Sequence, residues 1–215
     1  MSTKDREKEG KEPTVDLNVV LLPDEVTTDK LIALSTLLGK HFPTAFTLDR
    51  EFHLPHLSLY PARYPLRNQD KVEETVRNIA GSLEGMDVIL EGYSEFSGFL
   101  FFNVVKDRAI QNLHDTVFAA LNEQREGHVS DVVARLRGLS PRLKANVRRW
   151  GQIFVGEDYT PHVTLGYLQD RKLAREAIEI LPQEPIQFSP SAIALAPFAP
   201  YGTCPKPLFT FPVGR

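Results

Sequence analysis

The sequence is short of cysteine, and this scarcity excludes two kinds of site. Cys204 is the only cysteine among the 215 residues. The chain therefore cannot form an internal disulfide bond, and it cannot build a zinc site on several thiolates. A single thiol fits a reducing compartment, and we expect a cytoplasmic protein.

Long apolar runs are missing as well. The most apolar short run, residues 99–105, is far too short to cross a bilayer, so we expect no association with a membrane. Residues 2–12 hold four basic and four acidic side chains, and no apolar stretch follows them. This is not the pattern of a secretory signal. We predict a disordered, charged tail over residues 1–13 and a single domain over residues 14–215.

A strong charge of either sign is also absent. The formal net charge is −3, so any surface that attracts a polyanion must be local. One segment, residues 126–149, is locally basic, with Glu126 and Asp131 as its only acidic residues. It is either a solvated helix and loop or a mobile flap that contacts a phosphate-bearing ligand. Its basic residues are Arg135, Arg137, Arg142, Lys144, Arg148 and Arg149.

The apolar periodicity mixes strands and helices without strict alternation. Strands are predicted over residues 15–22, 52–60, 87–96, 99–106, 152–156 and 160–168, with one or two more after residue 186. Helices are predicted over residues 28–39, after Asn68, after Asp107 and over residues 170–181. A doubly wound parallel sheet would alternate regularly. The sequence therefore predicts an α+β fold with antiparallel sheets.

Two short segments, about half the chain length apart, share one pattern. Residues 55–59 are Pro-His-Leu-Ser-Leu, and residues 161–165 are Pro-His-Val-Thr-Leu. In a random sequence of this composition, a given histidine would carry such a pattern roughly once in a thousand times. Two copies among the six histidines therefore indicate a duplicated, β-rich unit.

The spacing within each copy has a structural meaning. Residues i and i+2 of a strand share a face, so His56 and Ser58 point the same way, and so do His162 and Thr164. If a pseudo-twofold axis relates the two units, both pairs face one cleft. Tyr60 would share the face of Ser58, where it could stack on a base, although packing in the core is equally consistent with its position.

Two imidazoles and two hydroxyls suit the cleavage of a phosphodiester. In-line attack on phosphorus needs a base on one side and an acid on the other, and histidine can serve as either near neutral pH. The hydroxyls can donate hydrogen bonds to the non-bridging oxygens. This chemistry requires no metal and no cofactor. His53 and His56 would lie on opposite faces of a strand, so we predict no metal site there. The remaining histidines, which lack a partner pattern, are expected on the surface: His41, His114 and His128.

The two motifs resemble the paired His-x-[Ser/Thr]-hydrophobic motifs of the 2H phosphoesterase superfamily. Within it, the chain is most similar to the RNA 2′,3′-cyclic phosphodiesterase and 2′-5′ RNA ligase-like group. The resemblance covers most of the chain in element order from about residue 15, and it is specific around the motifs. It implies a bilobal fold with a pseudo-twofold duplication, in which two antiparallel sheets line a central cleft and helices cover the outer faces. By position, His56 and His162 are the acid and base, and Ser58 and Thr164 bind phosphate oxygens.

The resemblance implies metal-independent hydrolysis or transfer at a cyclic or 2′-linked phosphate. The expected partner is a nucleotide or an RNA end, and no obligatory protein partner is evident. Many members carry an arginine shortly after the second motif, where this chain has Tyr167. Two alternatives to hydrolysis stay open: a module that binds a nucleotide or RNA end without turnover, and a 2′-5′ RNA ligase. The modest net charge disfavours the ligase, which must hold two RNA ends.

Overall fold

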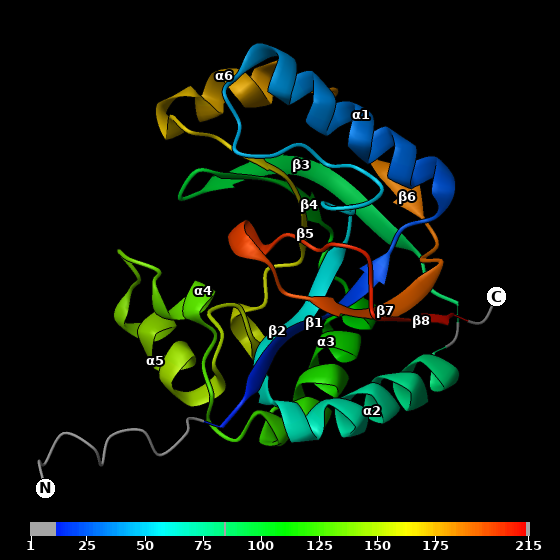
Figure 1. The fold of residues 1–215 in the computed structure, drawn as a ribbon. Coiled ribbons are helices and arrows are strands. Elements are labelled where there is room, and N and C mark those ends of the chain that lie inside the picture. Colours follow the sequence, from blue (N-terminus) through cyan, green and yellow to red (C-terminus); the bar gives the residue numbers. More distant parts are fainter. Residues whose placement is uncertain (1–11, 84, 214–215) are drawn as a thin grey trace, which may run out of the picture.

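The computed structural model describes residues 12–83 and 85–213, and over these residues eight strands form one antiparallel sheet (Figure 1). The strands are β1 (Thr14–Leu22), β2 (Leu57–Pro65), β3 (Val88–Phe96), β4 (Phe99–Val104), β5 (His162–Tyr167), β6 (Ile186–Phe188), β7 (Ala192–Pro197) and β8 (Phe209–Pro212). The helices are α1 (Glu25–His41), α2 (Gln69–Ser82), α3 (Arg108–Leu121), α4 (Asp131–Ala134), α5 (Pro141–Trp150) and α6 (Ala174–Glu179).

The sheet consists of two halves that meet at one pair of residues. Its strand order is β6-β3-β4-β5-β2-β1-β7-β8. Among the described residues, β2 and β5 share a single ladder pair, Leu57 with Val163. By contrast, β1 and β2 pair along most of their length. Helices α1 and α6 pack on the β6-to-β5 half, and α2 and α3 pack on the other half (Figure 1). The predicted α+β fold is confirmed, and the two predicted antiparallel sheets are the two halves of one sheet, joined through this pair.

The strand that carries the first motif begins later than the periodicity predicts. The prediction was 52–60, but β2 starts at Leu57. The side chain of Asp49 accepts hydrogen bonds from the backbone N–H groups of residues 51, 52 and 53 at 2.6–3.1 Å. A local turn of this kind competes with the sheet for the backbone. His56 therefore lies directly before β2 rather than inside it.

The strand predicted over residues 152–156 is wrong. Side chains satisfy the backbone of this segment: Ile153 N–H donates to Gln152 Oε1 at 2.8 Å, and its carbonyl accepts from Asn146 Nδ2 at 3.0 Å. Backbone groups that have such partners do not need a ladder. The segment forms an irregular wall instead, and the functional site lies against this wall.

Other local predictions are confirmed. Ser97 and Gly98 both have positive φ, 52° and 95°, as a tight hairpin between β3 and β4 requires. Asp107 begins α3 by accepting a hydrogen bond from Ile110 N–H at 2.8 Å. The number of strands after residue 186 differs from the prediction: the structure contains three, β6, β7 and β8, where one or two were predicted.

Most of the predicted tail lies outside the described residues, namely residues 1–11. Of the remaining two residues, Pro13 accepts a hydrogen bond from Leu66 N–H at 2.8 Å, and Glu12 forms an ion pair with Arg67. The domain boundary stays a prediction. No helix in the described part of the chain has the length and apolar character to span a bilayer.

Candidate active site

The pair at the centre of the sheet sets the two motifs side by side. Leu57 and Val163 are antiparallel partners, so the residues that flank them also face one another. His56 therefore lies opposite Thr164, and Ser58 lies opposite His162. Because Leu57 and Val163 are fully buried in the core, the flanking side chains occupy the other face. The four residues predicted from the motifs thus meet on one surface.

Each motif contains a β-bulge at the same place. Leu59 is skipped in the register between β1 and β2, and Leu165 is skipped in the register between β4 and β5. These two leucines are the last residues of the two five-residue motifs. A bulge turns the residues beyond it to the other face of the strand. Its recurrence at equivalent positions supports the duplication.

The first bulge removes Tyr60 from the face that Ser58 occupies. The side chain of Tyr60 is fully buried, and its hydroxyl donates to the carbonyl oxygen of Trp150 at 2.9 Å and to Asn122 Oδ1 at 3.2 Å. Its ring packs edge-on against Phe118. Two positions were open for Tyr60, stacking on a base and packing in the core, and the structure shows packing in the core. The buried ring cannot contact a substrate, so the predicted binding role of Tyr60 is wrong.

Both histidines are held by the same backbone contact. His56 Nδ1 lies 2.7 Å from the carbonyl oxygen of Leu54, and His162 Nδ1 lies 2.7 Å from that of Thr160. A carbonyl oxygen can only accept, so Nδ1 carries the proton in each ring. In a neutral ring, Nε2 then keeps its lone pair. The two imidazoles therefore have the same tautomer when they are neutral.

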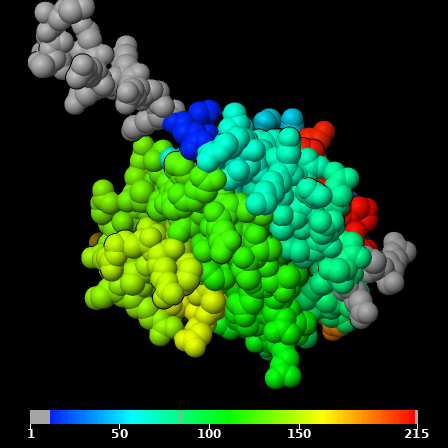
Figure 2. Space-filling view, turned by 90° about the horizontal axis from the view of Figure 1, so that it is seen from below, coloured from blue at the N-terminus to red at the C-terminus, as the bar shows by residue number. Residues whose placement is uncertain are grey.

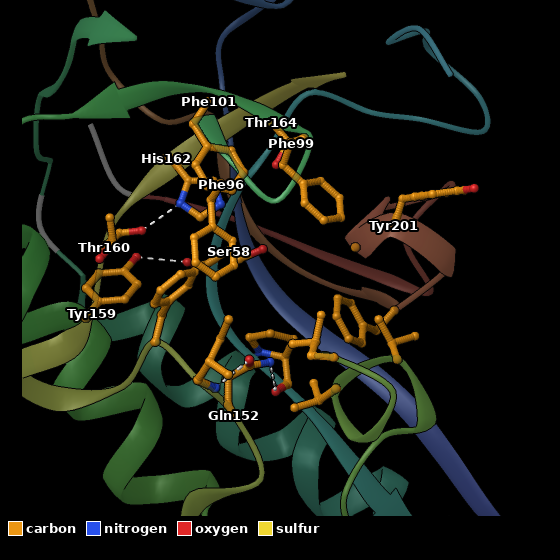
Figure 3. A pocket seen from close by; sticks show the side chains of 18 of the residues that line it. Ser58, Phe96, Phe99, Phe101, Gln152, Tyr159, Thr160, His162, Thr164 and Tyr201 are labelled. Carbon is orange, nitrogen blue, oxygen red and sulfur yellow. Dashed lines mark hydrogen bonds between the residues drawn. The ribbon is translucent and has the colours of Figure 1, made fainter. Parts of the chain in front are cut away.

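The surroundings of the two histidines differ. His162 is half-buried and lines an open pocket, where its ring stacks on Phe101 with centroids 3.7 Å apart (Figure 3). His56 is only 7% exposed and lines a smaller cavity beneath residues 201–204. Thr164 lines both spaces. The first histidine is therefore covered, while the second is open to the pocket.

Burial lowers the pKa of both imidazoles. Burial and the neighbouring His56 lower the pKa of His162 from 6.5 to about 4, against the hydrogen bond to Thr160. Burial also lowers the pKa of His56, against the backbone groups of Leu54 and Gly202. Both rings are therefore neutral at pH 7. A phosphate anion between them would raise both pKa values, because a negative charge stabilises an imidazolium.

Sequence reasoning missed Asn18, the residue that orients Ser58. Asn18 lies on β1 and is fully buried, and its Nδ2 donates to Ser58 Oγ at 2.8 Å. This bond occupies a lone pair of the hydroxyl and leaves its proton to be donated elsewhere. The available signal was a lone amide in the strand Asp-Leu-Asn-Val-Val-Leu-Leu.

The prediction that His114 lies on the surface is wrong, because it is fully buried on α3. Its Nδ1 donates to the carbonyl oxygen of Leu59 at 2.7 Å, and its Nε2 accepts from Gly156 N–H at 2.9 Å. Its ring stacks on Tyr159 at 3.8 Å, and the hydroxyl of Tyr159 donates to the carbonyl oxygen of Ser58 (Figure 3). His114 therefore ties the first motif to the residues that lead into the second.

The pocket beside His162 is mainly apolar. Besides Ser58, His162 and Thr164, its walls come from β4, from α4 with the turn after it, and from residues 152–160 (Figure 3). Among the described residues, no lysine, arginine, aspartate or glutamate lines it. The apolar lining residues include Phe96, Phe99, Phe101, Val132, Val133, Leu136, Ile153, Phe154 and Phe198.

The basic segment 126–149 borders this pocket with its apolar residues. Arg142 is held away by Asp158 and Glu157, at 2.7 and 3.3 Å. The space-filling view shows the yellow-green part of this segment packed against the green surface of α3 (Figure 2). The predicted contact between its basic side chains and a phosphate stays a prediction.

The expectation that His53 and His56 lie on opposite faces of a strand is wrong, because β2 begins at Leu57. His53 lies in the turn before β2, and its Nδ1 is 2.9 Å from Asp49 Oδ2. Within the described ranges, no group of three or more histidine, cysteine, aspartate or glutamate side chains lies close enough to hold a metal ion.

Two duplicated histidine motifs at the centre of one antiparallel sheet define a 2H phosphoesterase fold. Residues 39–198 match the family model of the 2′-5′ RNA ligase superfamily. Because this match spans more than half of the chain, the protein belongs to that superfamily. The resemblance inferred from the motifs is confirmed.

Solved structures share this fold at low sequence identity. TT0787 of Thermus thermophilus has a TM-score of 0.55 and 14% identity, over 93% of this chain and 99% of its own. Apo LigT of E. coli also has a TM-score of 0.55 and 14% identity, over 94% of this chain and 99% of its own. LigT of E. coli complexed with 3′-AMP has a TM-score of 0.55 and 14% identity, over 94% of this chain and 100% of its own. No curated protein sequence matches the chain.

Proposed function

We propose that the protein is a metal-independent phosphodiesterase that hydrolyses a cyclic or 2′-linked nucleotide phosphodiester. His56 and His162 act as the acid and base, and Ser58 and Thr164 bind the phosphate. The observation that carries this proposal is the symmetry of the two imidazoles. They flank one strand pair, and the same Nδ1–carbonyl contact orients each ring and sets its tautomer.

The reaction follows from this arrangement. One imidazole removes a proton from water as the water oxygen attacks phosphorus. The other imidazole, protonated when the anionic substrate is bound, gives its proton to the ribose oxygen as the opposite P–O bond breaks. Ser58 and Thr164 donate to the non-bridging oxygens as charge develops there. Each positioned acid or base contributes roughly 10²–10⁴-fold to the rate.

The structural relatives support a nucleotide as the substrate. E. coli LigT has been crystallised with 3′-AMP, and also with ATP and with NADP+. These complexes belong to a protein that is 14% identical to this chain, so for this chain they suggest a class of ligand. We propose a cyclic or 2′-linked nucleotide or RNA end within that class.

The test is turnover of nucleoside 2′,3′-cyclic phosphates by the full-length protein, with and without EDTA, followed by mass spectrometry. We expect product in both conditions. His56→Ala and His162→Ala should each lower kcat/KM about 10²–10⁴-fold. The control is His41→Ala, an exposed histidine at the end of α1. A loss of activity with EDTA contradicts the metal-free mechanism, and no turnover of any cyclic or 2′-5′-linked substrate overturns the proposal.

One observation favours a second candidate, a module that binds a nucleotide without turnover. His56 is covered by the backbone around Gly202, and a histidine that substrate cannot reach performs no proton transfer. Calorimetry that shows tight binding of 3′-AMP, together with the absence of product from every cyclic substrate, would support this candidate.

A further inference from the structure

The apolar pocket beside His162 restricts what the substrate carries next to its phosphate. We infer that the site takes a substrate whose base lies on the same ribose as the scissile phosphate, and that it disfavours a substrate with a second phosphate there. This inference rests on the proposed function, because it assumes that the scissile phosphorus lies between His56 and His162.

Electrostatics argues against a second phosphate in the pocket. A phosphate that leaves water needs cations or several hydrogen-bond donors to offset the loss of hydration. Apart from His162, which the scissile phosphate engages, the part of the chain that the structure describes places no basic side chain in the pocket wall. The nearby cations are engaged elsewhere: Arg125 donates to the carbonyl oxygens of His128 and Arg149, Lys106 donates to those of Glu157 and Tyr159, and Arg142 is paired with Asp158.

The aromatic lining argues for a base. Phe96 and Phe154 meet edge-to-face with centroids 5.4 Å apart, and Phe99 lies with Phe101 at 6.1 Å. Figure 3 shows Phe96, Phe99 and Phe101 around the same space, with His162 on one side and Tyr201 on the other. A flat, uncharged heterocycle can stack on such rings without losing the solvation of a charge.

The segment around α4 directs its apolar and its basic side chains to opposite sides. Val132, Val133 and Leu136 line the pocket, whereas Arg135 and Arg137 are exposed. The apolar side of this segment therefore faces the site, and its cations face solvent. Additional phosphates of a longer substrate can meet a cation only outside the pocket.

This arrangement distinguishes substrates that share a cyclic phosphate. In adenosine 2′,3′-cyclic phosphate, the ribose that carries the cyclic phosphate also carries the base. In ADP-ribose 1″,2″-cyclic phosphate, that ribose carries a pyrophosphate instead. A third compound, 1-O-methylribose 2′,3′-cyclic phosphate, has neither group. We expect kcat/KM to be highest for the adenosine compound and about 10–100-fold lower for the compound that lacks a base.

Leu136→Arg tests the electrostatic argument directly, because it places a cation in the pocket wall. We expect it to lower kcat/KM for adenosine 2′,3′-cyclic phosphate and to raise it for ADP-ribose 1″,2″-cyclic phosphate, a change of about tenfold or more in the ratio. The matched control is Ala134→Arg, which adds the same charge on the exposed side of α4. If Leu136→Arg does not fold, Phe154→Ala should lower kcat/KM for the adenosine compound alone.

The outcomes separate this inference from the proposed function. Equal kcat/KM for the three compounds, or a preference for the ADP-ribose compound, overturns the inference and leaves the phosphodiesterase intact. If the wild-type protein turns over none of them and no other cyclic or 2′-5′-linked substrate, the proposed function fails. Calorimetry then decides the inference, which requires 3′-AMP to bind at least about tenfold more tightly than ribose 3-phosphate.

Discussion

The two halves of the molecule present the same motif in different surroundings. In each half, a proline precedes a histidine, the histidine donates to the carbonyl oxygen two residues earlier, and a bulge follows at the fifth position. Outside these shared features, the surroundings of the two histidines differ. His162 faces an apolar pocket and stacks on Phe101, whereas His56 lies beneath residues 201–204. The duplication has kept the backbone geometry that positions the rings, and the flanking loops have made the two rings unequal.

The largest difference expected between the halves is in chemical accessibility. Diethyl pyrocarbonate should modify His162 before His56, because the cover over His56 must open before the reagent can reach it. Each 1.4 kcal/mol or so that the opening requires slows the reaction about tenfold. Peptide mapping by mass spectrometry at pH 7 measures the two rates. Tyr201→Ala, which removes ring contacts to Phe46 and Tyr167, should accelerate the modification of His56. Equal wild-type rates would contradict the asymmetry.

A smaller effect is expected on stability in acid. The folded-state pKa of His162 is about 4, below its value of about 6.5 in an unfolded chain. The unfolded chain therefore binds more protons between these pH values, and the folded state loses stability as the pH falls from about 6.5 to 4. Burial lowers the pKa of His56 and of His114 as well, so all three histidines act in the same direction.

Urea titrations at pH 7 and pH 5 measure this effect. We expect the free energy of unfolding of the wild-type protein to fall by about 1–3 kcal/mol between these pH values. His162→Ala and His114→Phe should each show a smaller fall, whereas His41→Ala, at an exposed position, should behave as the wild type does. If the free energy of unfolding falls equally in all variants, groups other than these histidines determine the loss of stability in acid.

The smallest predicted effect concerns Asn18, which serves the first motif. Asn18→Leu removes the hydrogen bond to Ser58 Oγ and frees the hydroxyl to rotate. We expect kcat to fall about 5–10-fold, the equivalent of one neutral hydrogen bond. Ser58→Ala should cost about as much, and the double variant should be no worse than Ser58→Ala, because Asn18 acts through Ser58. Additive losses would show that Asn18 has an independent role. Thr164→Ala is the matching change in the second motif.

The sequence was sufficient to predict which side chains within each motif share a face, because this depends on local spacing alone. The alternation of side chains along a strand placed His56 with Ser58 and His162 with Thr164, and the repeated pattern indicated that the two pairs meet. The bulges at Leu59 and Leu165 could not be anticipated, because they arise from pairing with strands far away in the chain. Tyr60 was therefore assigned to the wrong face.

Hydrogen bonds between residues far apart in the chain could not be predicted for the same reason. Nothing near His114 in the sequence shows that its ring will lie between the carbonyl oxygen of Leu59 and the N–H of Gly156. The bond from Asn18 to Ser58 likewise joins residues on separate strands. The late start of β2 is an intermediate case. The turn at Asp49 is local, and an aspartate that precedes several backbone donors is a recognisable turn signal.

The single ladder pair at the centre of the sheet makes correct folding a condition for reactivity. A slip of one residue between Leu57 and Val163 would reverse the faces of one strand relative to the other. One imidazole would then turn into the interior, and a leucine or valine side chain would emerge in its place. The two rings share one surface only when this pair is in register, so a single pairing decides whether both histidines reach the same ligand.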